Sequence, residues 1–281
     1  MIKLTEVSAR ENKITVTQLT LELGAGASAV FGSPADGVAL LLALIAGATR
    51  PSRGSARVLD RDPLSAAARR SIGYVPHAPN LPEALRVGQA LSLMATLRGS
   101  TIDTAAALSR FGLSGLSETR VSELTAAQVR AVALAEAVAS PAVRVLLVEE
   151  PFVSMEPSAS AAMRAALTSD PQRCVVITTA SLADARELAS VHVMLSSGRI
   201  TRVGTSNDLV DLSGPVKLVA IARDPRALVR ALSKHESLIK IEVHGDTVIV
   251  TAAELETASR ALNQAVVACG TSLDSLIAER A

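Results

Sequence analysis

The sequence predicts an α/β fold built on a mixed sheet with a helical part, followed by a small α+β domain. Two mainly apolar runs, Val143 to Val148 (broken by Arg144) and Cys174 to Thr178, are nearly continuous rather than alternating. Such runs are typical of parallel strands that helices cover on both faces. A turn framed by Gly32 and Gly37 joins the short apolar strand Ala29 to Phe31 to an apolar helix. These features favour a strand–turn–helix unit at the centre of a helix-covered sheet.

The spacing of apolar residues predicts further elements in the first part of the chain. Short runs near the N-terminus alternate with period two, as in antiparallel strands, and a hairpin around Ser196 to Arg199 closes this part. Between Pro82 and Ser140 the pattern is helical and rich in alanine. The helix after the glycine-framed turn reaches Ala46, and the remaining strands are expected at Ile14–Val16, Leu19–Leu23, Arg57–Leu59, Ser71–Val75, Val191–Leu195 and Ile200–Val203.

A break near Ser213 to Pro215 predicts two domains, residues 1–212 with a helical subdomain at about 82–140, and residues 213–281. The second domain spans about 65 residues, which is viable when it packs on a neighbour. Its apolar periodicity predicts an order of strand, helix, two strands and helix, at Lys217–Ala222, Pro225–Ser233, Leu238–Val243, Thr247–Val250 and Glu254–Ala268.

Composition argues against nucleic acid as a partner. The formal net charge is +1, from 28 basic and 27 acidic residues among 281, so no excess of positive charge attracts a polyanion. Aromatic residues make up 1% of the chain, which leaves little for stacking on bases.

The expected location is the cytoplasm, at the inner face of the cell membrane and attached there through a partner. Cys174 and Cys269 stand among apolar residues, as reduced buried thiols do in a cytosolic protein. The N-terminal residues Met1 to Glu6 have no apolar signal core. The longest apolar run, Val38 to Ala46, is too short to span a bilayer.

Six segments, in order and at matching spacing, resemble the nucleotide-binding (ATP-binding) subunit of ABC transporters, a cassette related to the P-loop NTPases. The resemblance covers about residues 2 to 210 and implies that fold. The matching segments are the phosphate-loop frame Gly32–Gly47, the turn Pro51–Gly54, the strand Ile72–Pro76 before the Gln loop, the signature Leu124–Gln128, the Walker B strand Val145–Pro151, and the closing hairpin with Gly198–Ile200 and Gly204–Thr205. The C-terminal part resembles the accessory domain of drug- and lipid-exporter members, with Ser272 to Ile277 similar to its closing helix.

The resemblance also shows which ligand-facing side chains differ from the family pattern. A working P-loop reads G-x-x-x-x-G-K-[ST]; its lysine reaches the phosphates and its hydroxyl binds Mg²⁺. Here Val38 stands at the lysine position, Ala39 at the hydroxyl position and Ala35 at a glycine position. The nucleotide-binding positions of this loop are therefore degenerate; they are Gly32, Ser33, Pro34, Ala35, Asp36, Gly37, Val38 and Ala39.

Asp36 has two interpretations. It places a carboxylate where phosphate would bind, and it could cap the helix that begins at Gly37 and so occupy that helix terminus in place of a ligand. Alternatively, its side chain is solvated and has no role.

The other nucleotide-facing positions are altered in the same way. No aromatic residue that could stack on adenine precedes Phe31. His77 stands for the Gln of the Gln loop, either as a ligand of water or as an exposed loop histidine. Glu149 and Glu156 replace two aspartates, and Ala180 replaces the switch histidine. Glu150, the catalytic base that the resemblance implies, remains, and we expect it to be vestigial or held by structural hydrogen bonds.

In the family, the signature segment faces the nucleotide of a second cassette. Thr125 and Gln128 are kept here, whereas Ala126 and Ala127 replace glycines that let the backbone approach phosphate. The expected partners are therefore a transmembrane permease, a second cassette in a hetero- or homodimer, or both. The expected cofactor is none, or weakly held ATP without properly held Mg²⁺.

Three functions stay open at this point. The first is a non-hydrolysing cassette that acts as a structural or regulatory partner of an active cassette or permease. The second is an atypical but functional ATPase that energises export. The third is a free-standing scaffold or regulator outside transport. The number of altered site positions argues against the second, because removing a single charge-stabilising donor from an active site costs about 10²–10³ in rate.

Overall fold

The computed structural model describes residues 1–153, 157–205, 216–233, 235, 237–252 and 255–280. The chain forms two compact units, Met1–Ser206 and Asn207–Ala281. The domain boundary expected between residues 212 and 213 lies outside the described residues.

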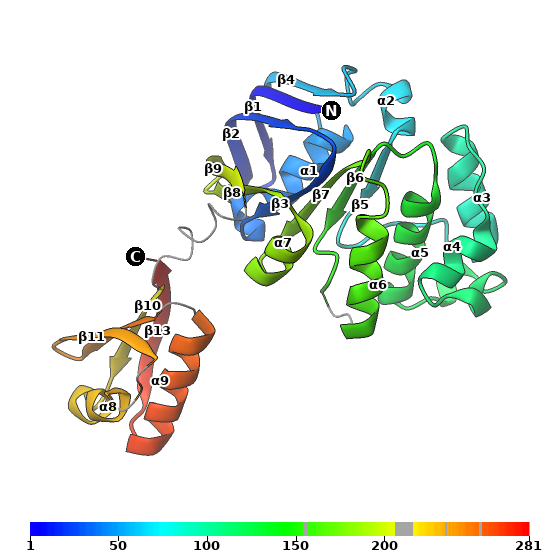
Figure 1. The fold of residues 1–281 in the computed structure, drawn as a ribbon. Helices are drawn as coiled ribbons and strands as arrows, with labels where there is room; N and C mark the ends of the chain where they lie inside the picture. Colours follow the sequence, from blue (N-terminus) through cyan, green and yellow to red (C-terminus); the bar gives the residue numbers. More distant parts are fainter. Residues whose placement is uncertain (154–156, 206–215, 234, 236, 253–254, 281) are drawn as a thin grey trace. The chain divides into compact units, whose positions relative to one another are not determined.

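The first unit is built on a six-stranded mixed sheet in the order β5-β6-β7-β3-β8-β9 (Figure 1). All neighbours in it are parallel except β8 and β9, which form the expected closing hairpin. Its strands are β3 (Gly26–Phe31), β5 (Ile72–Val75), β6 (Val145–Glu149), β7 (Cys174–Thr179), β8 (Val191–Ser196) and β9 (Arg199–Thr205). The α/β fold with a mixed sheet is thus confirmed.

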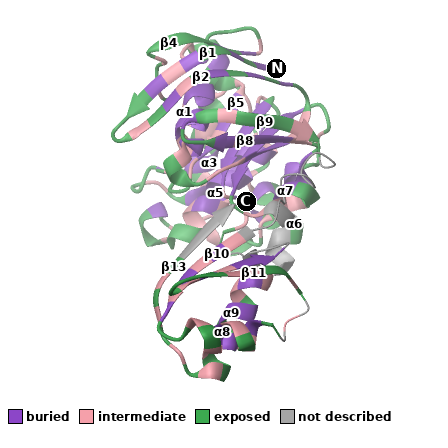
Figure 2. Cartoon of the chain, turned by 90° about the vertical axis from the view of Figure 1, so that its left-hand side faces the viewer, coloured by how far each residue is buried: buried purple, intermediate pink, exposed green. Residues whose placement is uncertain are grey.

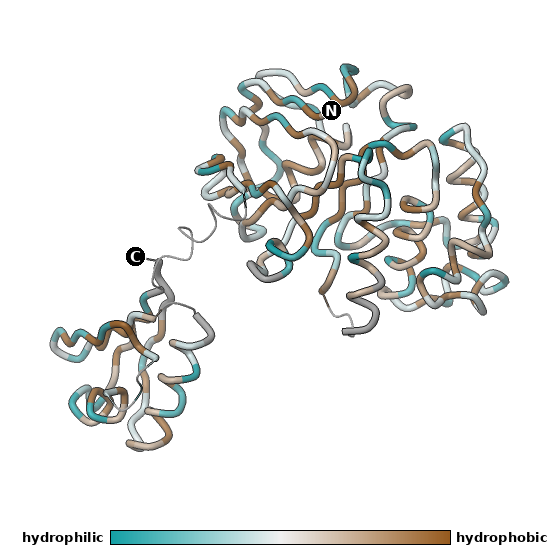
Figure 3. Tube along the Cα trace, in the orientation of Figure 1, coloured by the Kyte–Doolittle hydropathy of each residue, from teal (hydrophilic) through white to brown (hydrophobic). Residues whose placement is uncertain are grey.

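Both faces of the central strands β6 and β7 are buried, as the continuous apolar runs predict. Val145 and Leu147 of β6 enter one hydrophobic cluster, whereas Leu146 and Val148 enter the other. Figure 2 shows the buried residues along these strands, and Figure 3 shows their hydropathy. The first cluster also holds the antiparallel sheet of β1 (Ile2–Glu11), β2 (Ile14–Leu23) and β4 (Arg53–Val58), together with α1 (Val38–Ala46).

The second cluster lies under the helical part. It contains residues from α3, α5, α6 and α7 among others. The helices of the first unit besides α1 are α2 (Ala66–Arg70), α3 (Val87–Leu97), α4 (Thr104–Arg110), α5 (Ala126–Ala139), α6 (Pro157–Leu167) and α7 (Leu182–Leu188).

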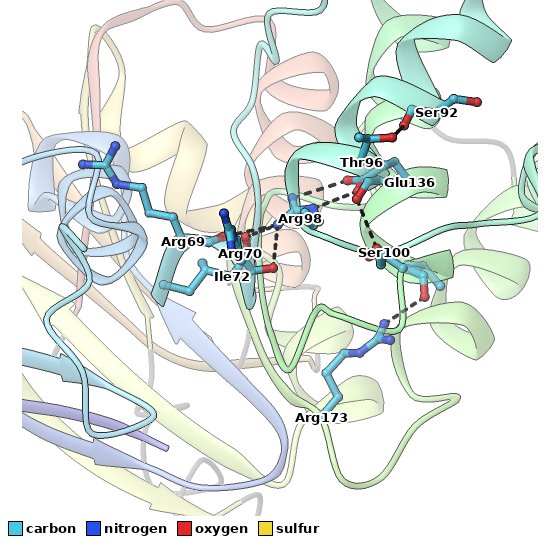
Figure 4. Close-up of polar contacts among 12 residues, drawn as sticks. Arg69, Arg70, Ile72, Ser92, Thr96, Arg98, Ser100, Glu136 and Arg173 are labelled. Atoms are coloured by element: carbon cyan, nitrogen blue, oxygen red, sulfur yellow. Dashed lines mark hydrogen bonds and ion pairs between the residues drawn. The ribbon is translucent and has the colours of Figure 1, made fainter. Parts of the chain in front are cut away.

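A buried ion pair joins the helical part to the central sheet (Figure 4). Arg98, at the end of α3, places Nε 2.8 Å from Oε1 of Glu136 in α5, whose side chain is 2% exposed. Nη1 of Arg98 donates to the carbonyl oxygen of Ile72, the first residue of β5, at 2.6 Å. One guanidinium therefore ties α3, α5 and β5 together.

The second unit has the order β10-α8-β11-β12-α9-β13 and an antiparallel sheet in the order β11-β12-β10-β13. The expected strand, helix, two strands and helix are present. The elements are β10 (Val216–Ala222), α8 (Pro225–Leu232), β11 (Leu238–His244), β12 (Thr247–Ala252), α9 (Leu255–Cys269) and β13 (Leu273–Arg280).

The helix expected at Ser272 to Ile277 is wrong, because the chain there enters strand β13. This strand pairs antiparallel with β10, with Ser275 opposite Ile221. Its residues from Leu273 to Leu276 alternate between half-buried and exposed, which is the period of a strand. Pairing with β10 satisfies backbone groups that would otherwise stand at an open sheet edge.

Candidate functional site

The carboxyl ends of three neighbouring parallel strands bring the candidate residues together. In the register of the sheet, Phe31 of β3 is opposite Thr179 of β7, and Glu149 of β6 is opposite Thr178. The segments that follow these strands therefore meet at one edge. They carry the glycine-framed loop after β3, Glu150 after β6 and Ala180 after β7.

The loop after β3 keeps its two glycines for reasons of space. A Cβ on Gly32 would lie 2.7 Å from the carbonyl oxygen of Leu195, and a Cβ on Gly37 would lie 2.7 Å from Cγ1 of Val16. Gly37 also has a φ of +91°, which side chains rarely adopt. Between the glycines, Pro34–Asp36 form one 3₁₀ turn, and Ser33, Pro34 and Ala35 are exposed.

Asp36 turns its carboxylate back into this loop. Its Oδ2 accepts the backbone N–H of Ser33 at 2.8 Å and the Ser33 hydroxyl at 2.6 Å. Its Oδ1 accepts the N–H of Ser197, in the β8–β9 hairpin, at 2.7 Å. The hydrogen bond from the Ser33 side chain, with those from the Ser197 and Ser33 backbone, lowers the pKa of Asp36. Asp36 therefore stays ionised at neutral pH.

The expected role of Asp36 as the cap of α1 is wrong. Gly37 occupies the N-cap of that helix, and no side chain bonds its first turn. Asp36 is the last residue of the 3₁₀ turn, so its carboxylate reaches residues before it in the chain. The alternative of a solvated carboxylate without a role is also wrong, because three protein donors hold it.

The first turn of α1 offers no polar side chain at the two positions that differ from the P-loop pattern. Val38 is 5% exposed and belongs to the hydrophobic core, and Ala39 is half-buried. Neither side chain can bind an anion or a metal ion.

At the end of β6, the two oxygens of the buried Glu149 carboxylate each accept a hydrogen bond from the protein. Its Oε1 accepts the hydroxyl of Tyr74 at 2.6 Å, and its Oε2 accepts the backbone N–H of His77 at 2.9 Å. Burial, together with the neighbouring Glu149, raises the pKa of Tyr74 above its ordinary value. Sequence reasoning did not single out Tyr74, whose position opposite Leu147 depends on the pairing of β5 with β6.

Arg130 of α5 is a second residue that sequence reasoning missed. It is 8% exposed, and its Nη2 donates to the carbonyl oxygens of both Glu149 and Glu150. Its Nη1 lies 3.3 Å from Nδ1 of His77, whose side chain is otherwise exposed. Burial lowers the pKa of Arg130, and the two glutamates oppose that shift. The signal in the sequence that could have identified it was the position of this arginine within a mostly apolar helical stretch.

Glu150, expected to be vestigial or held by structural hydrogen bonds, follows the end of β6. Its N–H donates to the carbonyl oxygen of Thr178 at 3.0 Å, and its φ is +43°. Burial raises the pKa of its carboxyl group, while the backbone N–H of the exposed Ala180 bonds the carboxylate. Glu156 lies outside the described residues.

The signature segment is not brought to the glycine-framed loop. Thr125 is the N-cap of α5, and it exchanges hydrogen bonds with Gln128: its N–H donates to Oε1 at 2.9 Å, and its Oγ1 accepts from the Gln128 N–H at 3.3 Å. Ala126 and Ala127 are exposed. Because α1 and α5 belong to different hydrophobic clusters, the two segments lie on different sides of the sheet (Figure 1).

Among the described residues, no group of three or more histidine, cysteine or acidic side chains could hold a metal ion. No described helix is both long and apolar enough to cross a membrane.

Comparison with solved structures supports the fold. An ATP-binding subunit of an ABC transporter superposes with a TM-score of 0.69 at 20% identity, over 75% of this chain and 92% of that one. The cbiO1 subunit of Clostridium perfringens, part of the ABC transporter complex cbiONQ, superposes with a TM-score of 0.60 at 19% identity, over 75% and 90%.

Comparison of sequences identifies the family. The profile of the family described as ABC transporter matches residues 16–153. The chain is 31% identical to the thiamine import ATP-binding protein ThiQ of Rhizobium meliloti, over 61% of this chain and 76% of the relative. It is 32% identical to the sulfate/thiosulfate import ATP-binding protein CysA of Mesorhizobium japonicum, over 65% and 56%, so it spans just over half of that relative.

These relatives carry the names of import proteins, so they do not support the expected resemblance to the exporter branch. Fold, sequence profile and relatives agree at the coarser level: the chain belongs to the ABC transporter ATP-binding family.

Proposed function

We propose that this chain is a non-hydrolysing cassette that serves as a structural or regulatory subunit of an ABC transporter. The observation that carries the proposal is the Asp36 carboxylate, which takes the backbone N–H of Ser33 inside the loop that holds phosphate in the family. A working loop keeps such N–H groups free for the anion. Here an internal anion uses one of them.

Electrostatics favour the same conclusion. The hydrogen bonds to Asp36 lower its pKa, so a full negative charge stands in the loop at neutral pH. Val38, at the lysine position, supplies no charge to oppose it. Like charges at contact distance repel, so the approach of a triphosphate is unfavourable.

The residues present also do not fit Mg²⁺. This ion requires about six oxygen ligands in near-octahedral geometry, some of them from the protein. Ala39 provides no oxygen in its side chain, and both carboxylate oxygens of Glu149 accept hydrogen bonds from Tyr74 and His77. We therefore derive no hydrolytic step through Mg·ATP at this site.

The rest of the cassette supports a role in an assembly. Ala126 and Ala127 leave the N-terminus of α5 open, and the resemblance implies that this segment faces the nucleotide of a second cassette. The helical part offers an apolar surface to a permease: Leu93 is 40% and Leu97 is 66% exposed, whereas Val87 and Leu91 are core residues. The import names of the relatives favour uptake as the direction of transport.

Titration of the purified full-length chain with ATP and Mg²⁺ tests the absence of a working site. Calorimetry should detect no binding, and ATP at about 5 mM should leave the melting temperature unchanged, because a ligand stabilises only by RT ln(1 + [L]/Kd). A micromolar Kd or Mg²⁺-dependent turnover would favour the atypical ATPase instead.

Isolation from native cells in mild detergent tests the assembly. The proposal expects a polytopic membrane subunit, a second cassette with an intact P-loop, or both to be recovered with the chain. Recovery as a monomer would favour the free-standing regulator.

A further inference from the structure

Arg130 is a buried cation in an otherwise apolar stretch of α5. It lies two residues after Gln128, so it belongs to the first turns of the helix that the signature segment begins. Burying a guanidinium costs free energy unless polar groups surround it, and burial indeed lowers the pKa of Arg130. A buried guanidinium at this position therefore requires hydrogen-bond partners that compensate for its desolvation.

Those partners are backbone atoms of the emptied site. The carbonyl oxygens of Glu149 and Glu150 both accept from Nη2, and the His77 ring lies beside Nη1. A guanidinium carries donors in a fixed planar fork, so contacts with these groups define the direction of the helix as well as its distance. Arg130 thus connects α5 to the end of β6 and to the turn after β5.

The segment Glu149–Glu150, to which Arg130 donates, is also hydrogen-bonded to the end of β7. Glu150 adopts a φ of +43°. This backbone conformation is strained for any residue other than glycine, and it persists only where the surrounding structure imposes it. On one side, its N–H donates to the carbonyl oxygen of Thr178; on the other, its own carbonyl oxygen accepts from Arg130. The link therefore runs from α5 through Glu150 to the end of β7.

From these contacts we infer that Arg130 is a positioning residue that fixes the N-terminus of α5, residues Thr125 to Gln128, relative to the ends of β6 and β7. The capping pair Thr125 and Gln128 keeps that helix terminus intact. The backbone carbonyl oxygens of Glu149 and Glu150 thus act as an anchor for the signature segment. That this segment then meets a partner's nucleotide in a preset orientation rests on the proposed function.

Hydrogen exchange on the full-length chain tests the link itself. Removing a hydrogen-bonded charge should make the amides of residues 124–131 and 149–151 exchange about tenfold faster in Arg130→Met, with the second unit unchanged. Arg130→Lys keeps the charge but not the fork, so its exchange should lie between the two. Arg110→Met, at an exposed arginine of α4, is the matched control and should behave as wild type.

Two results would overturn the inference. One is unchanged exchange at residues 124–131 in Arg130→Met. The other is an even rise across the whole first unit, which would mean a general loss of core stability. If Arg130→Met does not fold, Arg130→Lys decides alone by whether its faster exchange is confined to the same two segments.

A second measurement uses the partner cassette, where one is recovered. A loosened signature segment should raise the KM of the partner for ATP severalfold and change kcat less, because the cap contributes to nucleotide binding. An unchanged KM in the presence of locally faster exchange contradicts the role toward the partner. Failure to recover any partner contradicts the proposed function, while the exchange result still decides whether Arg130 positions α5.

Discussion

Asp36 and Ser197 are 161 residues apart in the chain, yet Oδ1 of Asp36 accepts the Ser197 N–H at 2.7 Å. A second bond between the same segments runs from the Gly198 N–H to the carbonyl oxygen of Asp36 at 3.2 Å. The loop after β3 is therefore fastened to the β8–β9 hairpin by the residue whose carboxylate also accepts the Ser33 N–H within that loop. Under the proposed function, the same carboxylate would also oppose the binding of phosphate there.

The Asp36 contacts predict an acid-sensitive contribution to stability. The pKa of Asp36 is lower in the folded chain than its ordinary value of 3.8, so its contribution to stability is complete above pH 3.8 and is lost as pH falls through the lower, folded value. At pH 7, Asp36→Asn should melt below wild type, and the difference should shrink below about pH 3.8. Thermal denaturation from pH 2.5 to 7 measures this. A difference independent of pH would contradict the assignment.

Breaking the buried pair of Arg98 and Glu136 should be costly. Arg98→Met leaves the 2%-exposed Glu136 carboxylate without its cation and should lower the free energy of unfolding by about 3–5 kcal/mol. Urea denaturation of the first unit measures the loss. Lys3→Met, at a pair with Glu22 in which both side chains are more than half exposed, is the control and should cost about 0–1 kcal/mol. Equal losses of unfolding free energy in the two variants would show that the Arg98–Glu136 pair stabilises the fold no more than an exposed pair does.

Restoring two P-loop residues should not restore hydrolysis. In the double variant Val38→Lys and Ala39→Ser, Asp36 still places its charge in the loop, and Ala180 still lacks the switch side chain. Lysine at a 5%-exposed core position is also expected to destabilise α1. Phosphate release from Mg·ATP should remain at the background rate, and any Mg²⁺-dependent turnover would show that Asp36 and Ala180 do not prevent hydrolysis.

Two glycines with similar backbone angles should respond differently to alanine. Gly198 has a φ of +73°, and a Cβ there would lie 2.0 Å from the carbonyl oxygen of Thr15. Gly99 has a φ of +74° and has nothing within 4 Å. Gly99→Ala should cost only the left-handed backbone strain, about 1–2 kcal/mol, whereas Gly198→Ala should cost clearly more. Chemical denaturation measures the free energy of unfolding of both variants. Equal losses would mean that the β8–β9 hairpin shifts away from the Thr15 carbonyl oxygen at no cost.

Much of the fold could be predicted from sequence because burial on both faces leaves a direct signal. The runs at Val143 to Val148 and Cys174 to Thr178 overlap the strands β6 and β7, with bounds that differ by one or two residues. The segment from Ser272 to Ile277 was expected to be helical from its resemblance to the closing helix of an accessory domain, whereas its strand form depends on pairing with β10.

The site was harder to predict than the fold. The edge at which the loop, Glu149, Glu150 and Ala180 meet follows from parallel strand order. The partners of Glu149 do not, because Tyr74 reaches its carboxylate across 75 residues of chain and Arg130 of α5 reaches its backbone carbonyl oxygen. Local patterns carry no information about which long-range donor fills a buried carboxylate.

The bond between Tyr74 and Glu149 has an optical consequence. The chain contains one tyrosine and no tryptophan, so its near-ultraviolet absorption and emission come chiefly from a single ring at the centre of the altered site. Carboxylates that accept a phenol proton quench tyrosine emission. The intrinsic fluorescence of the unlabelled protein should therefore change when a ligand, partner or substitution breaks the hydrogen bond between Tyr74 and Glu149.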